Sequence, residues 1–199
     1  TDFCGNLPLL LRDNSSVNFA TIDRLKIYWN WPSPDDTSIF YNPVKGAAYS
    51  HTYTGFGYVA SKQVNVKIEA YSTGGCHTEK INNSILFASP RLAFENVPLY
   101  CNNINANILL TQARDTSSFP GSGFYYGDGI INPNIFNPSV AGPGNHLIYY
   151  KYALSNGCTD SVSKTVRVGI QPAVNAGPDE TILQGGIIQY AKEVKEQGL

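Results

Sequence analysis

Apolar and polar residues alternate in two segments of the chain, at residues 64–70 and 162–168, and the tyrosine-rich residues 147–152 form a third predicted strand. A period of two places one set of side chains on the buried face of a β-strand and the other set on its opposite face. The pattern therefore predicts an all-β fold built from antiparallel β-sandwiches. Turn residues separate further predicted strands, and helical character is confined to residues 191–197. The further predicted strands are residues 16–21, 24–31, 81–87, 106–110 and 130–135.

The dipeptide Gly-Cys occurs twice, at residues 75–76 and 157–158, each time after a tyrosine-rich strand pattern and before a short alternating segment that ends in a proline linker. Each copy is preceded by one lone upstream cysteine, Cys4 for the first copy and Cys101 for the second. Two similar parts of roughly ninety residues, each with its own pair of cysteines, are typical of a tandem array of small extracellular β-sandwiches.

Proline-containing linkers at residues 88–90 and 170–172 divide the chain. We expect one β-sandwich at residues 1–89 and a second at residues 90–171. Residues 172–199 are expected to begin a further repeat or to form a C-terminal tail.

Four cysteines can form two disulfides in three ways. We predict Cys4–Cys76 and Cys101–Cys158, because each pair then closes one repeat. The alternative is four reduced, buried cysteines in a cytosolic protein. A zinc site is disfavoured, because the chain has no C-x-x-C and its histidines are not at ligand spacing from the cysteines.

The net charge of −1 and the charged fraction of 15% provide no electrostatic attraction for nucleic acid or for an anionic membrane. The longest apolar run, at residues 7–11, is too short to span a bilayer, so no direct membrane insertion is expected. No signal peptide is visible at Thr1, which predicts that the residues come from the interior of a longer or processed protein. Abundant turn residues together with these cysteines favour a secreted or cell-surface location.

Tyr28, Trp29, Trp31 and Tyr41 form the densest group of aromatic residues. Strand alternation predicts Trp29 and Trp31 on one face and Tyr28 on the other. On an exposed face the two indoles would form a platform for sugar rings. The competing interpretation is that at least one of them is a core tryptophan that packs against a disulfide. The possible partners are therefore surface glycans or other cell-surface proteins.

Three groups of acidic residues carry the oxygen atoms that calcium prefers, but none has the spacing of a calcium-binding loop. Ordinary turns explain them better, so no metal and no cofactor are expected. These groups are Asp23 with Asp35 and Asp36, Asp128 between two glycines, and Asp179 with Glu180.

His51 and His146 lack a nearby nucleophile motif, and the chain has no G-x-S-x-G, H-E-x-x-H or P-loop. We therefore expect structural histidines and a protein that is not an enzyme. If the chain belongs to an assembly, Tyr149, Tyr150 and Tyr152 are the expected apolar contact for a partner.

Residues 124–130, 136–144 and 156–159 resemble the Ig-like repeats of Bacteroidetes cell-surface and secreted proteins. Those repeats run G-x-F-x-G-x-G-V, then F-x-P-x-x-A-G-x-G-x-H-x-I-x-Y-x-Y, then G-C. Residues 174–186 are similar to the opening of a following PKD-like module.

Residues 51–53, 64–70 and 75–76 are similar to the end of a PKD (polycystic kidney disease) domain. The first part of the chain departs from that family at residues 28–32, where Tyr-Trp-Asn-Trp-Pro replaces the usual W-D-F-G-D-G. Together the resemblances imply a non-catalytic extracellular module of a large, adhesin-type bacterial surface protein, acting as a spacer or interaction domain. The alternatives are a carbohydrate-binding module and a subunit of a surface secretion or motility assembly.

Overall fold

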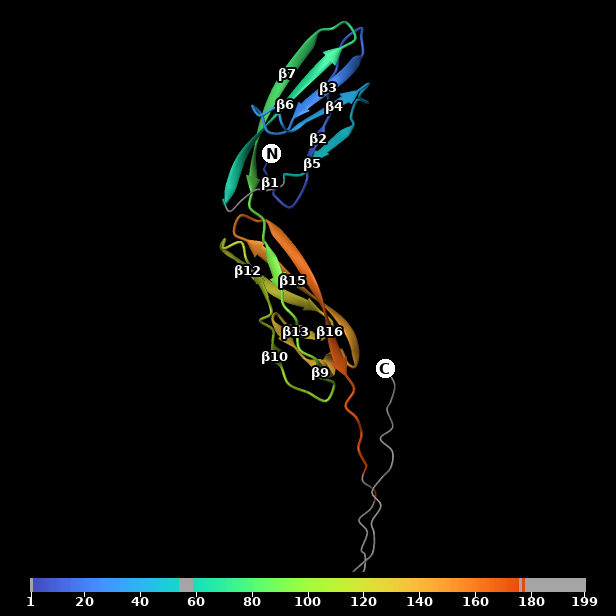
Figure 1. Ribbon diagram of the computed structural model, residues 1–199, viewed down its shortest axis with the longest axis vertical. Helices are drawn as coiled ribbons and strands as arrows, with labels where there is room; N and C mark the ends of the chain where they lie inside the picture. The colour runs from blue at the N-terminus through green and yellow to red at the C-terminus, as the bar shows by residue number, and fades with distance from the viewer. Residues whose placement is uncertain (1, 54–58, 176, 178–199) are drawn as a thin grey trace, which may run out of the picture. The chain divides into compact units, whose positions relative to one another are not determined.

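The computed structural model describes residues 2–53, 59–175 and 177 (Figure 1). Within these residues the chain forms sixteen strands and one short helix, α1 (Pro138–Ala141), which confirms the predicted all-β class. Most of the predicted tail, including Asp179, Glu180 and the helical segment at residues 191–197, lies outside the described residues.

Seven strands make up what we call the first repeat. They are β1 (Phe3–Cys4), β2 (Leu9–Arg12), β3 (Ile22–Tyr28), β4 (Thr37–Tyr41), β5 (Ala48–His51), β6 (Ser61–Ser72) and β7 (His77–Phe87). Five of them form one sheet in the order β1-β7-β6-β3-β4, and β2 pairs with β5 in a second sheet. The pairings are antiparallel except for that of β1 with β7, which is parallel.

The core of the first repeat lies between these two sheets. Ile27, Trp29 and Val66 form its buried centre. Partly buried side chains from both sheets pack around it: Leu9, Leu11, Phe40, Tyr49 and Ile68. Burial of each large apolar side chain stabilises the fold by about 1.5–3 kcal/mol, which is why the alternating segment at residues 64–70 keeps one face inward as β6.

The second repeat contains the remaining long strands. Its elements are β9 (Tyr100–Cys101), β10 (Ile108–Leu109), β12 (Gly121–Gly127), β13 (Ile130–Asn132), β14 (Ile135–Phe136), α1, β15 (Gly144–Leu154) and β16 (Thr159–Gly169). One sheet has the order β12-β15-β16-β9 and another the order β10-β14-β13. Two short strands before and within this region, β8 (Leu92–Phe94) and β11 (Ala113–Asp115), pair with each other. The strands predicted at residues 147–152 and 162–168 are confirmed as parts of β15 and β16.

Turn chemistry explains the connections in the second repeat. Gly127 and Gly129 flank Asp128 with φ of 126° and 74°, so the predicted tight turn is confirmed. Asn137 caps α1, because its side-chain oxygen accepts from the backbone N–H groups of Ser139 and Val140.

Three sequence predictions of strands need correction. The single strand predicted at residues 130–135 is two antiparallel strands, β13 and β14, with a turn between them. No strand forms at residues 16–21, where Phe19 takes a left-handed backbone with φ of 60° that interrupts an extended chain. The strand predicted at residues 24–31 ends earlier, because a turn begins at Trp29 and contains a cis peptide bond between Trp31 and Pro32.

By contact density the chain divides into two compact units. Unit 1 contains residues 1–93, 113–124 and 151–162, and unit 2 contains residues 94–112, 125–150 and the described residues from 163 onward. Each unit is drawn from separated stretches of chain, and the boundaries at residues 89 and 171 stay predictions.

Candidate functional site

Trp29 is a core residue of unit 1. Its side chain is 1% exposed, and its indole Nε1 donates to Ser38 Oγ at 2.9 Å. Its ring stacks on that of His51, with centroids 4.9 Å apart and planes 11° from parallel. Trp29 therefore cannot stack on a ligand in the folded protein, and the interpretation as a core tryptophan is correct. The sequence predicted that this core tryptophan packs against a disulfide, but in the structure it stacks on His51 instead.

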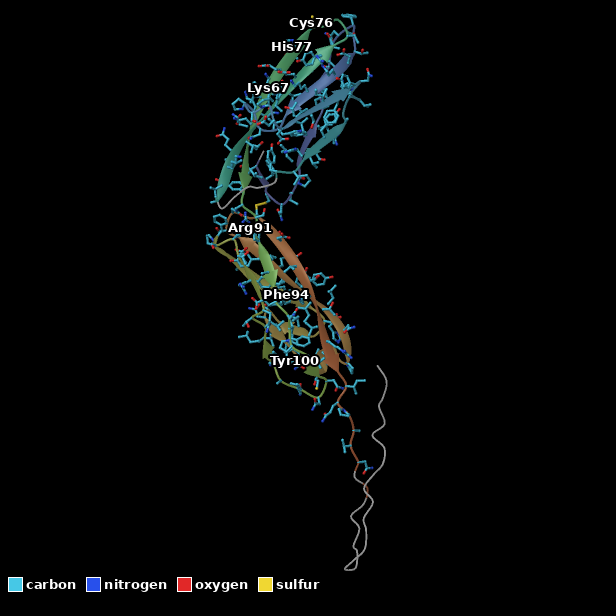
Figure 2. The ribbon with its side chains drawn as sticks, in the orientation of Figure 1. Lys67, Cys76, His77, Arg91, Phe94 and Tyr100 are labelled. Carbon is cyan, nitrogen blue, oxygen red and sulfur yellow. A yellow bond between two sulfur atoms is a disulfide. The ribbon has the colours of Figure 1, made fainter. Side chains whose placement is uncertain are left out.

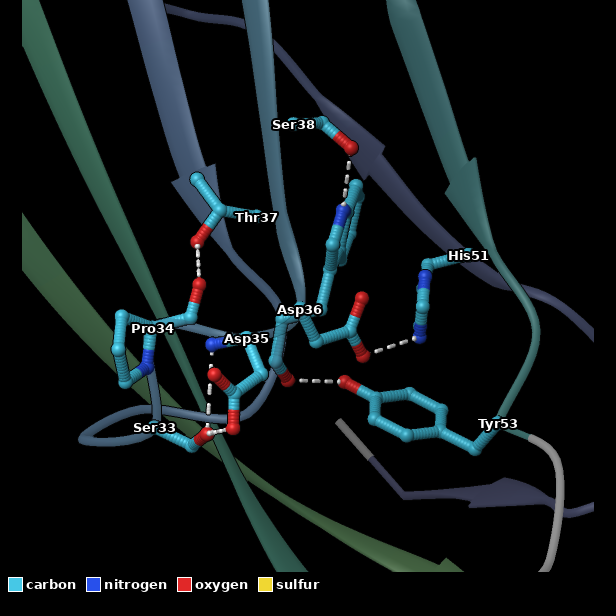
Figure 3. Close-up of polar contacts among 9 residues, drawn as sticks. Ser33, Pro34, Asp35, Asp36, Thr37, Ser38, His51 and Tyr53 are labelled. Atoms are coloured by element: carbon cyan, nitrogen blue, oxygen red, sulfur yellow. Dashed lines mark hydrogen bonds and ion pairs between the residues drawn. The ribbon is translucent and has the colours of Figure 1, made fainter.

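Ser38, His51 and Tyr53, labelled in Figure 3, make contacts with this tryptophan. His51 Nε2 lies 3.0 Å from Asp36 Oδ2, and the Tyr53 hydroxyl donates to the Trp29 carbonyl oxygen at 2.6 Å. Burial, together with the negative charge of Asp36, raises the pKa of Tyr53 to about 12. The phenol thus stays neutral at physiological pH, as a hydrogen-bond donor to the core backbone must.

The neighbouring turn uses its acidic residues locally. Ser33 Oγ donates to Asp35 Oδ2 at 3.2 Å, and Thr37 Oγ1 donates to the Pro34 carbonyl oxygen at 2.7 Å (Figure 3). Asp36 faces His51 instead, so the candidate calcium ligands point to different partners. In the part of the chain that the structure describes, no three His, Cys, Asp or Glu side chains gather as metal ligands would.

The opposite face of the large sheet, which we call the outer face, carries a buried ion pair. Lys67 and Glu69 of β6 are 6% and 7% exposed, and Lys67 Nζ lies 2.9 Å from Glu69 Oε1. The same ammonium group lies 2.6 Å from Glu79 Oε2 on β7 and 4.0 Å from the centroid of the Trp31 ring. One face of the Trp31 ring is therefore covered by a cation.

The pKa values on the outer face follow from these contacts. Hydrogen bonds to Glu79 and Glu69 raise the pKa of Lys67 above its ordinary value. Burial would raise the pKa of Glu69, but hydrogen bonds from Lys67 and Tyr71 outweigh it and lower the pKa of that carboxyl. Both groups are charged near neutral pH, and each stabilises the ionised form of the other.

Aromatic rings surround this pair on the outer face. Tyr28 packs edge-on against Trp31, with centroids 5.3 Å apart, and its hydroxyl donates to Glu69 Oε2 at 3.3 Å. Tyr71 donates to the same oxygen at 2.8 Å. Tyr41 of β4 is 71% exposed and lies in register with Arg24 of β3, which on its other side is in register with Tyr71 of β6.

Three of the four predicted ligand-binding aromatics thus share the outer face, and Trp29 lies on the other. The predicted alternation of Trp29 and Trp31 on one face is wrong, because the turn that begins at Trp29 ends the period of two. Sequence reasoning also missed Lys67, Glu69 and Tyr71. The alternation at residues 64–70 places Lys67 and Glu69 on the same face of one strand. Two opposite charges two residues apart in a strand were therefore the available signal for this ion pair.

The disulfide joins Cys4 to Cys158, with Cα atoms 5.6 Å apart, and both residues lie in unit 1. Cys76 and Cys101 are free and exposed; Figure 2 shows Cys76 at the tip of the β6–β7 hairpin. The predicted pairs Cys4–Cys76 and Cys101–Cys158 are therefore wrong.

Strand length explains the correction. Cys4 lies opposite Phe87 at the end of β7, whereas Cys76 directly precedes its start. Eleven residues of strand separate the two positions, which corresponds to roughly 35 Å at ~3.3 Å per residue. A disulfide needs Cα atoms within about 7 Å. The same geometry separates Cys101, opposite Gly169, from Cys158 across the eleven residues of β16.

Hydrogen bonds reinforce the bridge on both sides. Asn6 Nδ2 donates to the Thr159 carbonyl oxygen at 3.1 Å, and Asn156 Nδ2 donates to the Ala88 carbonyl oxygen at 2.9 Å. Asn156 Oδ1 also accepts from the backbone N–H of Cys158 at 2.9 Å. The bridge is thus one member of a set of contacts between residues distant in sequence.

The remaining candidates have structural contacts in unit 2. His146 is 8% exposed, and its ring nitrogens lie 2.8 Å from the Gly142 carbonyl oxygen and 3.6 Å from Asp128 Oδ2. Tyr150 is buried against Tyr125 with centroids 4.8 Å apart, so it cannot contribute to an exposed patch for a partner.

Tyr149, by contrast, is half-buried and stacks on Tyr126. Among the described residues, the structure contains no helix with the length and apolarity required to cross a bilayer.

No protein-family model matches the sequence, and no curated protein matches it. Solved structures with a similar arrangement of strands include the fibronectin(III)-like modules of CbhA from Clostridium thermocellum. Their sequence identity with this chain is 16% and the TM-score is 0.32. The match covers 85% of this chain and 89% of that chain. Another is the extracellular domain of protocadherin GammaB4, with 16% identity, a TM-score of 0.25, and coverage of 80% of this chain and 26% of that chain. Superpositions this loose place no residue of the chain, so we derive its function from its own contacts.

Proposed function

We propose that the chain is a non-catalytic structural module of an extracellular protein and acts as a spacer within an array of β-sandwich repeats. The observation that carries this proposal is the Cys4–Cys158 bridge, which spans 154 residues. Disulfides persist in oxidising compartments, so the bridge supports an exported location. The resemblance of the motifs to Bacteroidetes repeats extends the proposal to a bacterial surface protein of the adhesin type, with a PKD-like module followed by an Ig-like module.

The position of the bridge suits a module that carries tension. A load applied at the two ends of the chain passes from Cys4 to Cys158 through a covalent bond. Residues 5–157 then lie in a closed loop that cannot be extended while the bond is intact. Only the hydrogen bonds of the chain outside the loop, chiefly those of β16, resist the force.

The polar side chains of unit 1 also favour a structural role. His51 is held between Trp29 and Asp36, and the Lys67–Glu69 pair is enclosed by tyrosine hydroxyls and aromatic rings. Groups that are already paired and buried contribute to a single rigid arrangement and are poorly placed to act on a substrate.

Single-molecule force spectroscopy on the whole chain tests the proposal. With the bridge intact we expect a short extension, and reductant should add a contour length of about 500 Å, the span of the released residues at ~3.3–3.6 Å each. Cys158→Ser should give the long extension without reductant, and Cys76→Ser should behave as the unaltered protein. Long extension of the oxidised, unaltered protein would contradict the proposal.

A second candidate function is carbohydrate binding by the outer face. It is favoured by the exposed ring of Tyr41, which shares this face with Tyr28 and Trp31. A glycan array probed with a multivalent display of the chain tests it, since avidity makes weak binding detectable. Binding that is lost in Tyr41→Ala and Trp31→Ala, with the fold intact, would support the candidate. An array without signal would leave the spacer as the better proposal.

A further inference from the structure

The upstream cysteines of the two repeats occupy equivalent positions. Cys4 of β1 lies opposite Phe87 of β7 in a parallel pair, and Cys101 of β9 lies opposite Gly169 of β16 in a parallel pair. In both repeats the residue after the cysteine donates its backbone N–H to that opposite residue at 2.9 Å. In both, the cysteine carbonyl oxygen accepts from the backbone N–H three residues later, at 3.0 and 3.1 Å. We call these two the strand cysteines.

The two Gly-Cys pairs are equivalent as well. Cys76 closes the hairpin between β6 and β7, and Cys158 closes the hairpin between β15 and β16. The glycines before them, Gly75 and Gly157, have φ of 80° and 88°. In both hairpins the residue four positions before the cysteine donates its backbone N–H to the cysteine carbonyl oxygen at 2.9 Å. We call Cys76 and Cys158 the hairpin cysteines.

The disulfide joins the strand cysteine of the first repeat to the hairpin cysteine of the second. We infer that this bond is one link of a repeating series, in which every strand cysteine bonds to the hairpin cysteine of the following repeat. Cys101 is then the half-cystine for a repeat that follows, and Cys76 is the half-cystine for a repeat that precedes. The partner at each end is a further repeat of this type.

The surfaces next to the cysteines agree with this assignment. Ala88 follows β7 and is 3% exposed, with its carbonyl oxygen bonded to the side chain of Asn156 in the second repeat's hairpin. Its counterpart after β16, Ile170, is 52% exposed. Pro90 is buried, and its counterpart Pro172 is exposed. The surface that a hairpin covers in the first repeat is therefore bare in the second.

A hollow of about 370 Å³ in unit 2 opens beside this bare surface, with mostly apolar walls that include Val168, Gly169 and Ile170. An exposed apolar side chain next to a hollow is a feature of docking surfaces. The equivalence with Ala88 indicates what docks there: the hairpin of another repeat.

The covalent step balances as a thiol–disulfide exchange. The two thiols lose two protons and two electrons as the S–S bond forms, and a disulfide oxidant such as oxidised glutathione accepts them and becomes two thiols. The inference deepens the proposed spacer function, because linked repeats would bring Cys76 and Cys101 into the same load-bearing series as Cys4 and Cys158.

A second copy of this chain provides both missing partners and is the probe for the test. Cys76→Ser retains only Cys101 as a free thiol, and Cys101→Ser retains only Cys76. In a glutathione redox buffer we expect a mixture of the two variants to form a disulfide heterodimer through Cys101 and Cys76, as shown by mass spectrometry of the joined peptides. Each variant alone should stay monomeric, and the unaltered protein should form a ladder of linear oligomers.

A matched pair of substitutions separates docking from random thiol chemistry. Ile170→Arg in the Cys76→Ser copy should abolish the heterodimer, whereas Val44→Arg, at an exposed apolar residue of the first repeat, should leave its yield unchanged. Homodimers in equal yield, or no protein–protein disulfide at all, would overturn the inference. Because Cys4–Cys158 is intact in both variants, the force measurement on that bridge stands apart from this result.

Discussion

The hairpins that contain Cys76 and Cys158 have the same turn, the same backbone hydrogen bonds and the same Gly-Cys sequence. Their cysteines nevertheless differ completely: Cys158 is 1% exposed and oxidised, and Cys76 is exposed and free. Local sequence and local structure therefore do not decide whether such a cysteine forms a bridge. The segment that packs against the hairpin decides it: among the described residues, the stretch around Cys4 and Ala88 packs against the second hairpin and brings a cysteine to it.

The two repeats also differ on the outer faces of their longest hairpin strands. In β6 this face carries the buried pair of Lys67 and Glu69. Counting back from the hairpin cysteines, Tyr149 and Lys151 occupy the same positions in β15. The ion pair therefore has no counterpart at these two positions of the second repeat. Both tryptophans also lie in the first repeat, so tryptophan fluorescence reports on it selectively.

Loss of the bridge should have the largest effect. In the chain-entropy treatment, opening a loop of 154 residues lowers the free energy of unfolding by about 5 kcal/mol. Cys158→Ser should show this loss in chemical denaturation followed by tryptophan fluorescence. Cys76→Ser removes the equivalent cysteine of the other hairpin and should change stability by less than ~0.5 kcal/mol. Equal losses in the free energy of unfolding for the two substitutions would show that the two hairpin cysteines contribute equally to stability, which contradicts the account.

The next effect concerns the residues that follow β7 and β16. Ala88→Arg forces a long charged side chain into a buried position and should lower the free energy of unfolding by about 1–3 kcal/mol or more. Ile170→Arg places the same side chain at the equivalent exposed position and should be nearly neutral. Urea denaturation of both variants measures the difference, and a large loss in Ile170→Arg would show that this surface is covered within the chain itself.

A smaller effect is expected from the side-chain amide that reinforces the bridge. Asn156→Ala removes the bonds to Ala88 and Cys158 and should cost ~1–3 kcal/mol. The matched control is Gly74→Ala in the first hairpin. Gly74 is the equivalent position, and an added Cβ there has its nearest neighbour at 3.9 Å, so the change should not destabilise the protein. Thermal unfolding of both variants gives the comparison.

The smallest effect is a pH dependence confined to the first repeat. The pKa of Glu69 is lowered below its ordinary value of 4.5, so its contribution to stability is present above that value and is lost as the pH falls through the folded-state pKa. Lys67→Met removes the main group that lowers this pKa, so the loss should move to higher pH. Tryptophan fluorescence during acid titration measures the shift, and an unchanged titration would show that Lys67 does not hold the carboxyl in its charged form.

Alternation along the chain was sufficient to predict the all-β class and the strands that became β6 and β16, because one buried face imposes a period of two. The strand that became β15 was predicted instead from its place before the second Gly-Cys. The tight turn around Asp128 was also predictable, since Gly on both sides supplies the positive φ. The turn at residues 29–32 was not predictable from alternation. It ends the period of two, so Trp29 lies in the core while Trp31 lies on the outer face.

The disulfide could not be predicted from spacing. Closure of each repeat favours Cys4 with Cys76 on sequence alone, but the pairing depends on which end of β7 the first strand joins. That choice is made by long-range contacts such as those of Asn6 and Asn156. The equivalence of the strand and hairpin cysteines likewise becomes visible only once the strand registers are known.

Peptide mapping of the non-reduced protein by mass spectrometry tests the central claim most directly. In the purified monomer we expect one disulfide-linked peptide that joins Cys4 to Cys158, with Cys76 and Cys101 labelled by a thiol reagent. A Cys4–Cys76 or Cys101–Cys158 peptide would contradict the account, because each repeat would then be closed on itself and no half-cystine would remain for a neighbouring repeat.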